Sequence, residues 1–355
     1  MKILMIGPDR EVQGGVSTVI NNYYLGGLDQ LVDLKFIATM KDGSKFTKLK
    51  TAIRSYFEFR DSINYCDIVH VHMASRASFY RKSLFINFAK KKRKKIIIHM
   101  HGAEFKEFYM NESTEKQKKY ISEIFNKCDK IIALSEQWKK FLSGITDTSI
   151  EVLYNSIVIP ENIDKVYNSN QILFLGRLGK RKGVYDLLDV MPKLIDNHND
   201  VKVKICGDGE VEKVRRRCKE LSIDKNVEIF QWIKGKEKED ILLNSNIFVL
   251  PSYNEGMPMA LLEAMSYKNA VISTEIGGIP EVITNEKNGF LIKAGDKEAL
   301  LNDLNILLSD QDRLIELSEN AYKKAKDIFN IKNSIKKLIK IYNQLEIKGG
   351  EYIEC

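Results

Sequence analysis

Short apolar runs alternate with longer amphipathic stretches along most of this chain. In the first half, the runs have the length and the continuous apolar character of buried parallel strands, at 3–6, 34–37, 68–72, 96–100, 130–134 and 150–154. Between them lie segments with the spacing of amphipathic helices, at 16–24, 46–60, 79–90, 111–126 and 135–142. This alternation predicts an α/β fold in which helices cover both faces of a parallel sheet.

The second half of the chain repeats the pattern. Its strand-like runs lie at 172–175, 202–205, 227–230, 247–250, 270–273 and 290–292, and from Lys297 to about residue 345 the pattern is helical. We expect two doubly wound, Rossmann-like domains at 1–160 and 161–330, with the boundary in the polar segment 154–168. Residues 331–355 should form a C-terminal helix and tail that can pack back on the first domain. Ligands of open parallel sheets bind beyond the carboxyl ends of the strands, so a cleft between the domains should hold the site.

Composition narrows the class of protein. A length of 355 residues suits two ordinary domains, and the formal charge of +8 favours acidic partners: nucleotide phosphates, anionic lipid or nucleic acid. The five cysteines are scattered and contain no CxxC pair, which is typical of reduced thiols. We expect no signal peptide and no membrane span, because no apolar run approaches about 18 residues.

Basic residues accompany aromatic ones in two places. The stretch 46–60 is basic and aromatic, and the segment 79–90 runs into the block Lys90–Lys95. One interpretation is a solvated helix end, which is common for such a block. The other is a dock for an anionic membrane, because basic residues beside exposed aromatic side chains suit a lipid interface.

The stretch 251–265, PSYNEGMPMALLEAM, carries the most informative chemistry. A loop at 252–256 follows a buried strand, and Pro258 stands where a helix with an apolar stripe begins. Unpaired backbone N–H groups at such a helix start attract anionic oxygen, while Glu255 and Glu263 offer carboxylates. A nucleotide sugar would use both, because its phosphates need N–H groups and its hydroxyls suit carboxylates. An ordinary strand–loop–helix unit is the alternative.

Other candidate groups also follow strands. Arg177 and Lys182 come after the run 172–175, where two cations could neutralise a diphosphate, a task that other enzymes give to a metal. The alternative is a solvated basic turn. Gly14 and Gly15 lie between the first strand and its helix and allow close approach of backbone to a ligand, although the GxGxxG spacing is missing.

Four of the five histidines form two HxH pairs, His70/His72 and His99/His101. Residues i and i+2 of a strand share a face, but zinc needs a third ligand that the sequence does not place. We therefore expect no metal site, with one histidine of each pair facing the cleft and the other lying in the sheet layer. The DxD at 310–312 should cap a helix.

Taken in order, several of these segments resemble the retaining nucleotide-sugar glycosyltransferases of family four, which have the two-domain GT-B fold. They are GGV at 14–16, DIVHVH at 67–72, HMHG at 99–102, LYNSIVIP at 153–160, FLGRLGKRKG at 174–183, ICGDGE at 205–210, the E-x7-E of Glu255 and Glu263, and GGIPEVI at 277–283. The ordered set is specific for the family but not for the sugar. One departure is NS at 155–156, where the family often has NG at the hinge.

The resemblance implies a role for each matching residue. Arg177 and Lys182 would grip the donor diphosphate, Glu263 would take the ribose hydroxyls and Glu255 the hydroxyls of the sugar ring. The remaining residues would contact the donor through backbone or lie beside it: Gly256, Met257, Pro258 and Met259 at sugar and phosphate, Gly14 and Gly15 at the diphosphate, and His101 near the reacting sugar. The segment 230–235 would lie near the base.

The implied reaction is transfer of a hexose with retention, without metal or cofactor, from a nucleotide sugar such as a UDP-sugar. We expect a glycan or a lipid-linked acceptor, the lipid link resting only on the basic and aromatic surface, in cell-surface polysaccharide or glycolipid assembly at the cytoplasmic face of the membrane. No nucleic-acid partner is expected. The alternatives are a sugar-nucleotide epimerase on the same fold, a glycosidase using Glu255 and Glu263, and a sugar-binding protein without activity.

Overall fold

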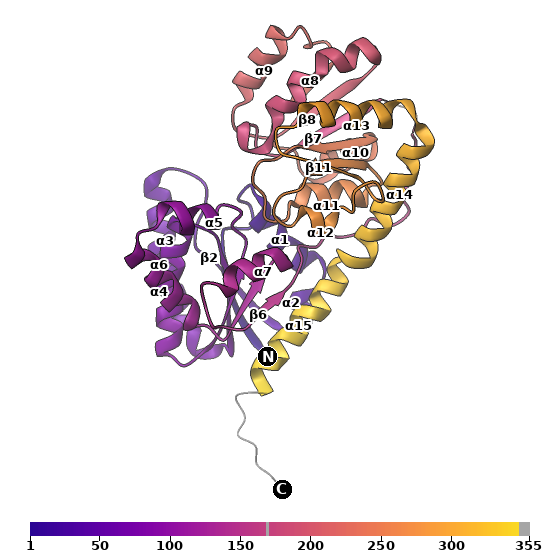
Figure 1. The fold of residues 1–355 in the computed structure, drawn as a ribbon. Coiled ribbons are helices and arrows are strands. Elements are labelled where there is room, and N and C mark those ends of the chain that lie inside the picture. The colour runs from indigo at the N-terminus through magenta and orange to yellow at the C-terminus, as the bar shows by residue number, and fades with distance from the viewer. Residues whose placement is uncertain (168–169, 348–355) are drawn as a thin grey trace. The chain divides into compact units, whose positions relative to one another are not determined.

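The computed structural model describes residues 1–167 and 170–347, which form two compact units (Figure 1). One unit contains residues 1–158 and the chain from Ile331 onward, and the other contains residues 159–330. Each unit is built on a parallel six-stranded sheet, as the alternating pattern predicts. Asn168 of the expected boundary segment, and the expected tail from residue 348 to Cys355, lie outside the described residues.

The sheet of the first unit has the strand order β2-β1-β3-β4-β5-β6. Its strands are β1 (Lys2–Gly7), β2 (Asp33–Ala38), β3 (Ile68–Met73), β4 (Lys95–Met100), β5 (Lys130–Ala133) and β6 (Ile150–Val152). The helices are α1 (Gly15–Leu25), α2 (Leu28–Leu31), α3 (Lys45–Ser62), α4 (Ala77–Lys91), α5 (Phe105–Glu107), α6 (Glu115–Asn126), α7 (Glu136–Ser143) and α15 (Ile331–Ile347). Figure 1 shows α3, α4 and α6 beyond one face of this sheet and α1, α2 and α15 beyond the other.

Strand β3 places apolar residues on one face of the sheet and histidines on the other. Val69, Val71 and Met73 belong to the apolar core that α3, α4 and α6 complete. His70 and His72, at the alternate positions, face the other side, where the rings of Tyr23 from α1 and Tyr342 from α15 meet them. A hydrogen bond of 2.6 Å joins the Tyr342 hydroxyl to His70 Nδ1, so the last helix of the chain is tied to the first sheet.

The sheet of the second unit has the order β12-β11-β10-β7-β8-β9. Its strands are β7 (Gln171–Leu175), β8 (Lys202–Cys206), β9 (Val227–Phe230), β10 (Ile247–Leu250), β11 (Ala270–Thr274) and β12 (Phe290–Ile292). The helices are α8 (Val184–Asn197), α9 (Val211–Glu220), α10 (Gly235–Leu243), α11 (Met259–Ser266), α12 (Ile279–Val282), α13 (Lys297–Ser309) and α14 (Gln311–Ile328).

Side-chain caps decide where several helices begin. The predicted helix at 111–126 starts only at Glu115, because Thr114 and Gln117 form a reciprocal capping box there, and Phe108–Glu112 is a separate π-helical turn. The carboxylate of Asp310 accepts a hydrogen bond of 2.9 Å from the backbone N–H of Arg313 and caps α14, so the DxD has the predicted capping role.

None of the described helices has the length and apolar character needed to cross a membrane. The four described cysteines, Cys66, Cys128, Cys206 and Cys218, are buried and free.

The contact between Tyr342 and His70 gives a test of how α15 is held. Tyr342→Phe keeps the buried ring but leaves His70 Nδ1 without its partner, which should cost about 1–3 kcal/mol locally. Hydrogen exchange of the α15 amides should become faster, whereas Tyr65→Phe, a variant of an exposed tyrosine in the same unit, should leave it unchanged. Unchanged exchange in Tyr342→Phe would show that apolar packing alone holds the helix.

Candidate active site

The second unit has its topological switch point between β7 and β10. From β7 the chain adds β8 and β9 on one side, then returns to add β10, β11 and β12 on the other. Consecutive connections run in opposite directions from this point, and ligands of open parallel sheets bind at such a point beyond the carboxyl ends of the strands. Arg177 and Lys182 follow β7, and Glu255 follows β10.

Glu255 is buried, with 6% of its surface exposed, and it is bound on both sides of the switch point. Ser252 Oγ donates a hydrogen bond of 2.8 Å to Glu255 Oε1, and Lys182 Nζ donates to the same oxygen. A buried carboxylate is tolerated only with such partners. The contact therefore joins the two loops that the sequence analysis selected separately.

The backbone of the Glu255 loop is fixed by neighbouring strands. Tyr253 donates its N–H to the Arg181 carbonyl oxygen at 2.8 Å, and Thr274 Oγ1 donates to the Ser252 carbonyl oxygen at 2.7 Å. Gly277 has a φ of 54°, and a Cβ there would lie 2.0 Å from the Glu255 carbonyl oxygen, so no other residue fits this close approach. These contacts hold the backbone of the loop in this conformation.

Arg177 and Lys182 differ in their surroundings. The Lys182 side chain is 15% exposed, and its stem runs past Gly176, whereas Arg177 is exposed and its stem lies against Gly209 in the loop after β8. Arg177 makes no hydrogen bond or ion pair within 1–167 and 170–347. One cation of the pair is thus neutralised by Glu255 and the other is open to a ligand.

Helix α11 begins directly after the Glu255 loop. Pro258 stands at its N-cap with φ −71° and ψ 123°, and Met259 is the first helical residue, one position later than the sequence pattern suggests. Gly256 accepts a hydrogen bond of 2.6 Å at its carbonyl oxygen from the N–H of Gly278, and Met257 and Met259 are buried.

Glu263, on α11, is paired with a residue that the sequence analysis missed. Lys238 Nζ of α10 donates a hydrogen bond of 2.8 Å to Glu263 Oε1. In the sequence Lys238 is one of several charged residues in GKEKED, and only the packing of α10 beside α11 distinguishes it.

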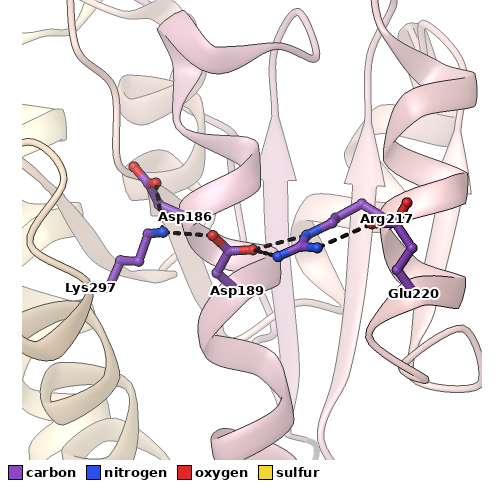
Figure 2. Close-up of polar contacts among 5 residues, drawn as sticks. All are labelled: Asp186, Asp189, Arg217, Glu220 and Lys297. Atoms are coloured by element: carbon purple, nitrogen blue, oxygen red, sulfur yellow. Dashed lines mark hydrogen bonds and ion pairs between the residues drawn. The ribbon is translucent and has the colours of Figure 1, made fainter.

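Helix α8, which begins just after Lys182, is held by a chain of ion pairs. Figure 2 shows Lys297 of α13 between Asp186 and Asp189, and Arg217 of α9 between Asp189 and Glu220. Lys297 Nζ lies 2.6 Å from Asp189 Oδ2, and Arg217 Nη2 lies 2.8 Å from Asp189 Oδ1. Single pairs of this exposure contribute little, but a connected set fixes the orientation of α8 against α9 and α13.

In the first unit, Gly14 and Gly15 start α1 after β1. Gly14 is the N-cap with a φ of 147°, and the space around it is open to at least 4 Å. A side chain would be strained at this φ, so the position presents bare backbone.

The four histidines His70, His72, His99 and His101 form one stacked layer on the face of the sheet that α1 and α15 cover. His70 Nε2 lies 3.3 Å from His99 Nδ1, and His72 Nδ1 lies 2.8 Å from His101 Nε2. The expectation that one histidine of each pair is open to the cleft is wrong for His70/His72. Both have 0% exposure, because strand residues i and i+2 share the covered face. His99 is buried too, and only His101, beyond the end of β4, is half-buried.

Burial keeps this layer neutral. It lowers the pKa of His70 to about 3, and burial followed by repulsion from His70 and Lys82 lowers the pKa of His101 to about 3. Burial, then repulsion from Arg81, also lowers the pKa of Lys82 to about 7.

Candidate ligand nitrogens of His70, His72 and His99 lie within 4.8 Å of one another, close enough to consider a metal ion. The group contains no carboxylate or thiolate, and the Lys82 side chain already repels positive charge at His72. A dication there would be buried without a compensating carboxylate or thiolate.

Family models match most of the chain. Residues 35–159 match the model of glycosyltransferase family 4, and residues 157–324 match that of the glycosyl transferases group 1. The chain belongs to the family-4-like glycosyltransferases.

Curated relatives of this chain agree with that family. The chain is 29% identical over 215 residues to a D-inositol 3-phosphate glycosyltransferase of Corynebacterium urealyticum, covering 58% of this chain and 49% of the relative. It is 24% identical over 186 residues to the capsular polysaccharide biosynthesis glycosyltransferase CapM of Staphylococcus aureus, covering 52% of this chain and 49% of the relative. The chain thus spans about half the length of these relatives.

Solved structures of the same fold extend over the full chain. The sucrose-phosphate synthase of Thermosynechococcus elongatus matches with a TM-score of 0.80 and 16% identity, covering 98% of this chain and 99% of the other. Anabaena HepE, solved in complex with UDP-glucose, matches with a TM-score of 0.76 and 16% identity, covering 97% and 100%. The predicted GT-B fold, with two parallel-sheet domains, is confirmed.

The histidine layer of this glycosyltransferase makes its stability depend on pH. The folded-state pKa of His101, about 3, is below the ordinary 6.5, so the unfolded chain takes up the proton first as the pH falls. Stability is therefore fully present above pH 6.5 and decreases toward pH 3, by at most about 1.4 kcal/mol per pH unit for each such histidine.

Urea unfolding at pH 7 and pH 5 measures this loss. His101→Gln should reduce the loss between the two pH values, while His198→Gln, which changes the one histidine of the second unit, should leave it unchanged. An equal pH dependence in His101→Gln and the unmodified chain would contradict the burial argument.

Proposed function

We propose that this protein transfers a hexose from a nucleotide diphosphate sugar, with a UDP-sugar as donor, and that the second unit binds the donor. The observation that carries the proposal is the buried contact of Glu255 with Lys182 across the switch point. A carboxylate fixed between two loops can accept hydroxyl hydrogen bonds, and the cation beside it can face a diphosphate.

In this proposal, Arg177 and Lys182 have different roles. Arg177 is unpaired in the described structure and is available to the diphosphate on binding, whereas Lys182 shares its charge between Glu255 and the leaving group. Fixed cations stabilise the negative charge that develops as the sugar–phosphate bond breaks. We therefore propose a reaction without a metal ion or a cofactor.

The other site residues follow the same assignment. Glu263, held by Lys238, takes the ribose hydroxyls, and the backbone of Gly256, Met257, Pro258 and Met259 contacts sugar and phosphate. Gly14, Gly15 and His101 belong to the first unit and act on the donor from there. The choice of UDP is supported by the fold shared with HepE, which was solved with UDP-glucose.

We propose that the configuration of the sugar is retained, through attack of the acceptor on the face that the diphosphate leaves. The mechanism needs no enzyme nucleophile, and the protein positions the acceptor and stabilises charge. The donor phosphate can take the acceptor proton. Because a relative is named for capsular polysaccharide biosynthesis, we assign the reaction to cell-surface polysaccharide or glycolipid assembly.

The acceptor in this proposal is a glycan, in particular one linked to lipid, and the enzyme works in the cytoplasm at the inner face of the membrane. Two segments are expected to dock on lipid. The one that ends in Lys90–Lys95 has fewer exposed aromatic side chains and fewer unpaired lysines than the sequence suggests. Phe79 and Phe85 are buried core residues rather than exposed aromatics, Lys94 Nζ donates to the Cys66 carbonyl oxygen at 2.7 Å, and Lys95 lies 3.4 Å from Asp129. The membrane contact is therefore assigned to α3.

Glu255→Gln tests the role of the carboxylate. The amide keeps the size of the side chain but loses the charge, so transfer should fall by about a hundredfold or more while UDP affinity changes little. UDP release from UDP-glucose in the presence of a membrane fraction measures transfer, and calorimetry with UDP measures binding. Glu298→Gln, at an exposed position of α13, is the control. Transfer at the original rate in Glu255→Gln would remove Glu255 from the mechanism.

Replacing both cations tests diphosphate recognition. Arg177→Ala with Lys182→Ala should raise the Kd for UDP by about tenfold or more, because charge-assisted hydrogen bonds contribute about 1.5–3 kcal/mol each. Affinity for uridine, which lacks the diphosphate, should not change. Arg216→Ala with Lys219→Ala, exposed on α9, provides a variant of equal charge. If UDP bound the doubly substituted site as tightly as before, the leaving-group assignment would be lost.

A further inference from the structure

A pocket of about 710 Å³ lies in the first unit. Helix α3 forms one wall, through Lys50, Arg54 and Glu58 among others, and the loop after β1 contributes Arg10 and Glu11. Phe36, half-buried on β2, adds an aromatic surface. All of these residues belong to the same compact unit, so the pocket is independent of how the two units are arranged.

The pocket offers three kinds of contact together. Lys50 and Arg54 make no hydrogen bond or ion pair with any residue that the structure describes, so their charges are open to an anion. Lys41 is different, because its ammonium group lies 2.9 Å from Asp9 Oδ2 and is already neutralised. Glu11 and Glu58 offer carboxylates for hydroxyl groups, and the Phe36 ring can pack against the apolar face of a sugar. A sugar bearing a phosphate satisfies all three contacts.

A neighbouring face of α3 carries an apolar stripe. Phe46, Leu49, Ile53 and Phe57 recur at the three- and four-residue spacing of one helix face, and their exposed fractions are 76%, 59%, 52% and 50%. Exposed apolar side chains in such a continuous row indicate an interaction surface. Lys50 lies four positions after Phe46, and Arg54 lies three positions before Phe57, so each is next to a stripe residue on the helix surface and the pocket wall borders the stripe.

Charge decides which partner suits this stripe. Helix α3 carries the five cations Lys45, Lys48, Lys50, Arg54 and Arg60 against the two acids Glu58 and Asp61. An amphipathic helix with apolar residues on one side and basic residues beside them binds in the interface of an anionic membrane. A protein partner would have to supply both an apolar groove and acidic groups, whereas an anionic bilayer offers both over its whole surface.

We propose that α3 lies in the surface of an anionic membrane and that the pocket beside it binds the acceptor, a sugar joined through phosphate to a membrane lipid. The phosphate contacts Lys50 and Arg54, the sugar hydroxyls contact Glu11 and Glu58, and the lipid chain remains in the bilayer along the stripe. This inference rests on the proposed transferase function and names the class of its acceptor.

Vesicle flotation of the full chain tests the membrane contact. The protein should float with vesicles of phosphatidylcholine and phosphatidylglycerol, and much less with phosphatidylcholine alone. Leu49→Ser with Ile53→Ser should lose at least about tenfold in affinity for the anionic vesicles, because two buried leucine-sized side chains are removed from the lipid contact. Leu25→Ser with Leu31→Ser is the matched control, because Leu25 and Leu31 are 74% and 64% exposed outside α3. Equal loss in both variants, equal binding of the unmodified protein to neutral vesicles, or no loss in Leu49→Ser with Ile53→Ser would overturn the docking face.

Soluble probes test the pocket. With UDP added at saturation to occupy the donor site, calorimetry should detect glucose 1-phosphate binding more tightly than inorganic phosphate or glucose. Lys50→Ala with Arg54→Ala should weaken it by about tenfold or more, and Lys116→Ala with Lys119→Ala, exposed on α6, should not. Inorganic phosphate binding as tightly as glucose 1-phosphate, or affinity for glucose 1-phosphate that survives the α3 substitutions, would overturn the acceptor class or its location.

The donor assignment and the α3 site can be refuted separately. The α3 variants should keep the UDP affinity of the unmodified protein, and Arg177→Ala with Lys182→Ala should keep vesicle binding. Absence of UDP binding by the unmodified protein would refute the donor assignment, while flotation and the glucose 1-phosphate titration would still judge the α3 site.

Discussion

The buried contact of Lys182 and Ser252 with Glu255 is the interaction that holds together the loops at the carboxyl edge of the second unit's sheet. Removing a charge pair from water costs free energy that its mutual attraction does not always recover, so such a pair is weak evidence for stability. Its position is the informative property: it joins the loops after β7 and β10, at the place where the sheet's connections reverse. Close backbone approach at Gly277 and the hydrogen bonds of Ser252, Tyr253 and Thr274 keep the loop in place, and the ion pairs of α8 fix the helix that follows Lys182.

In the first unit, one face of the sheet carries four histidines and is nevertheless buried. Four imidazoles are accommodated there by pairing with one another and with the Tyr342 hydroxyl. Tyr342 pairs with His70 Nδ1 and His99 Nδ1 pairs with His70 Nε2, so both ring nitrogens of His70 have a partner. The last helix thus completes a polar layer that residues 1–158 leave open, which explains why residues so far apart in sequence belong to one unit. His101, at the exposed end of the layer, is oriented by His72.

One face of helix α3 lines the pocket, and a neighbouring face carries the exposed apolar stripe. Its basic residues serve both, because those beside the stripe also line the pocket wall. This arrangement explains a sequence in which basic residues and exposed apolar residues stand beside Phe59, which belongs to the core. By contrast α4, which resembles it in composition, places Phe79 and Phe85 in the core. The two helices have similar compositions, and they differ in which apolar side chains are buried.

The sequence by itself determined the alternation of strands and helices, because a strand buried on both faces needs a continuous apolar run and a covering helix needs an amphipathic one. It also determined which residues lie at strand ends, and so selected Arg177, Lys182 and Glu255 as neighbours of one edge. The family followed from the ordered motifs. Local polarity could not reveal that His70 is covered by α15, because that contact comes from a helix about 270 residues later in the chain. Nor could it distinguish Lys238 among its charged neighbours, or the exposed stripe of α3 from the buried aromatics of α4. Those features depend on which helix packs against which strand, and only the tertiary structure decides that, because the same amphipathic pattern can bury its apolar face in a core or leave it open to a partner.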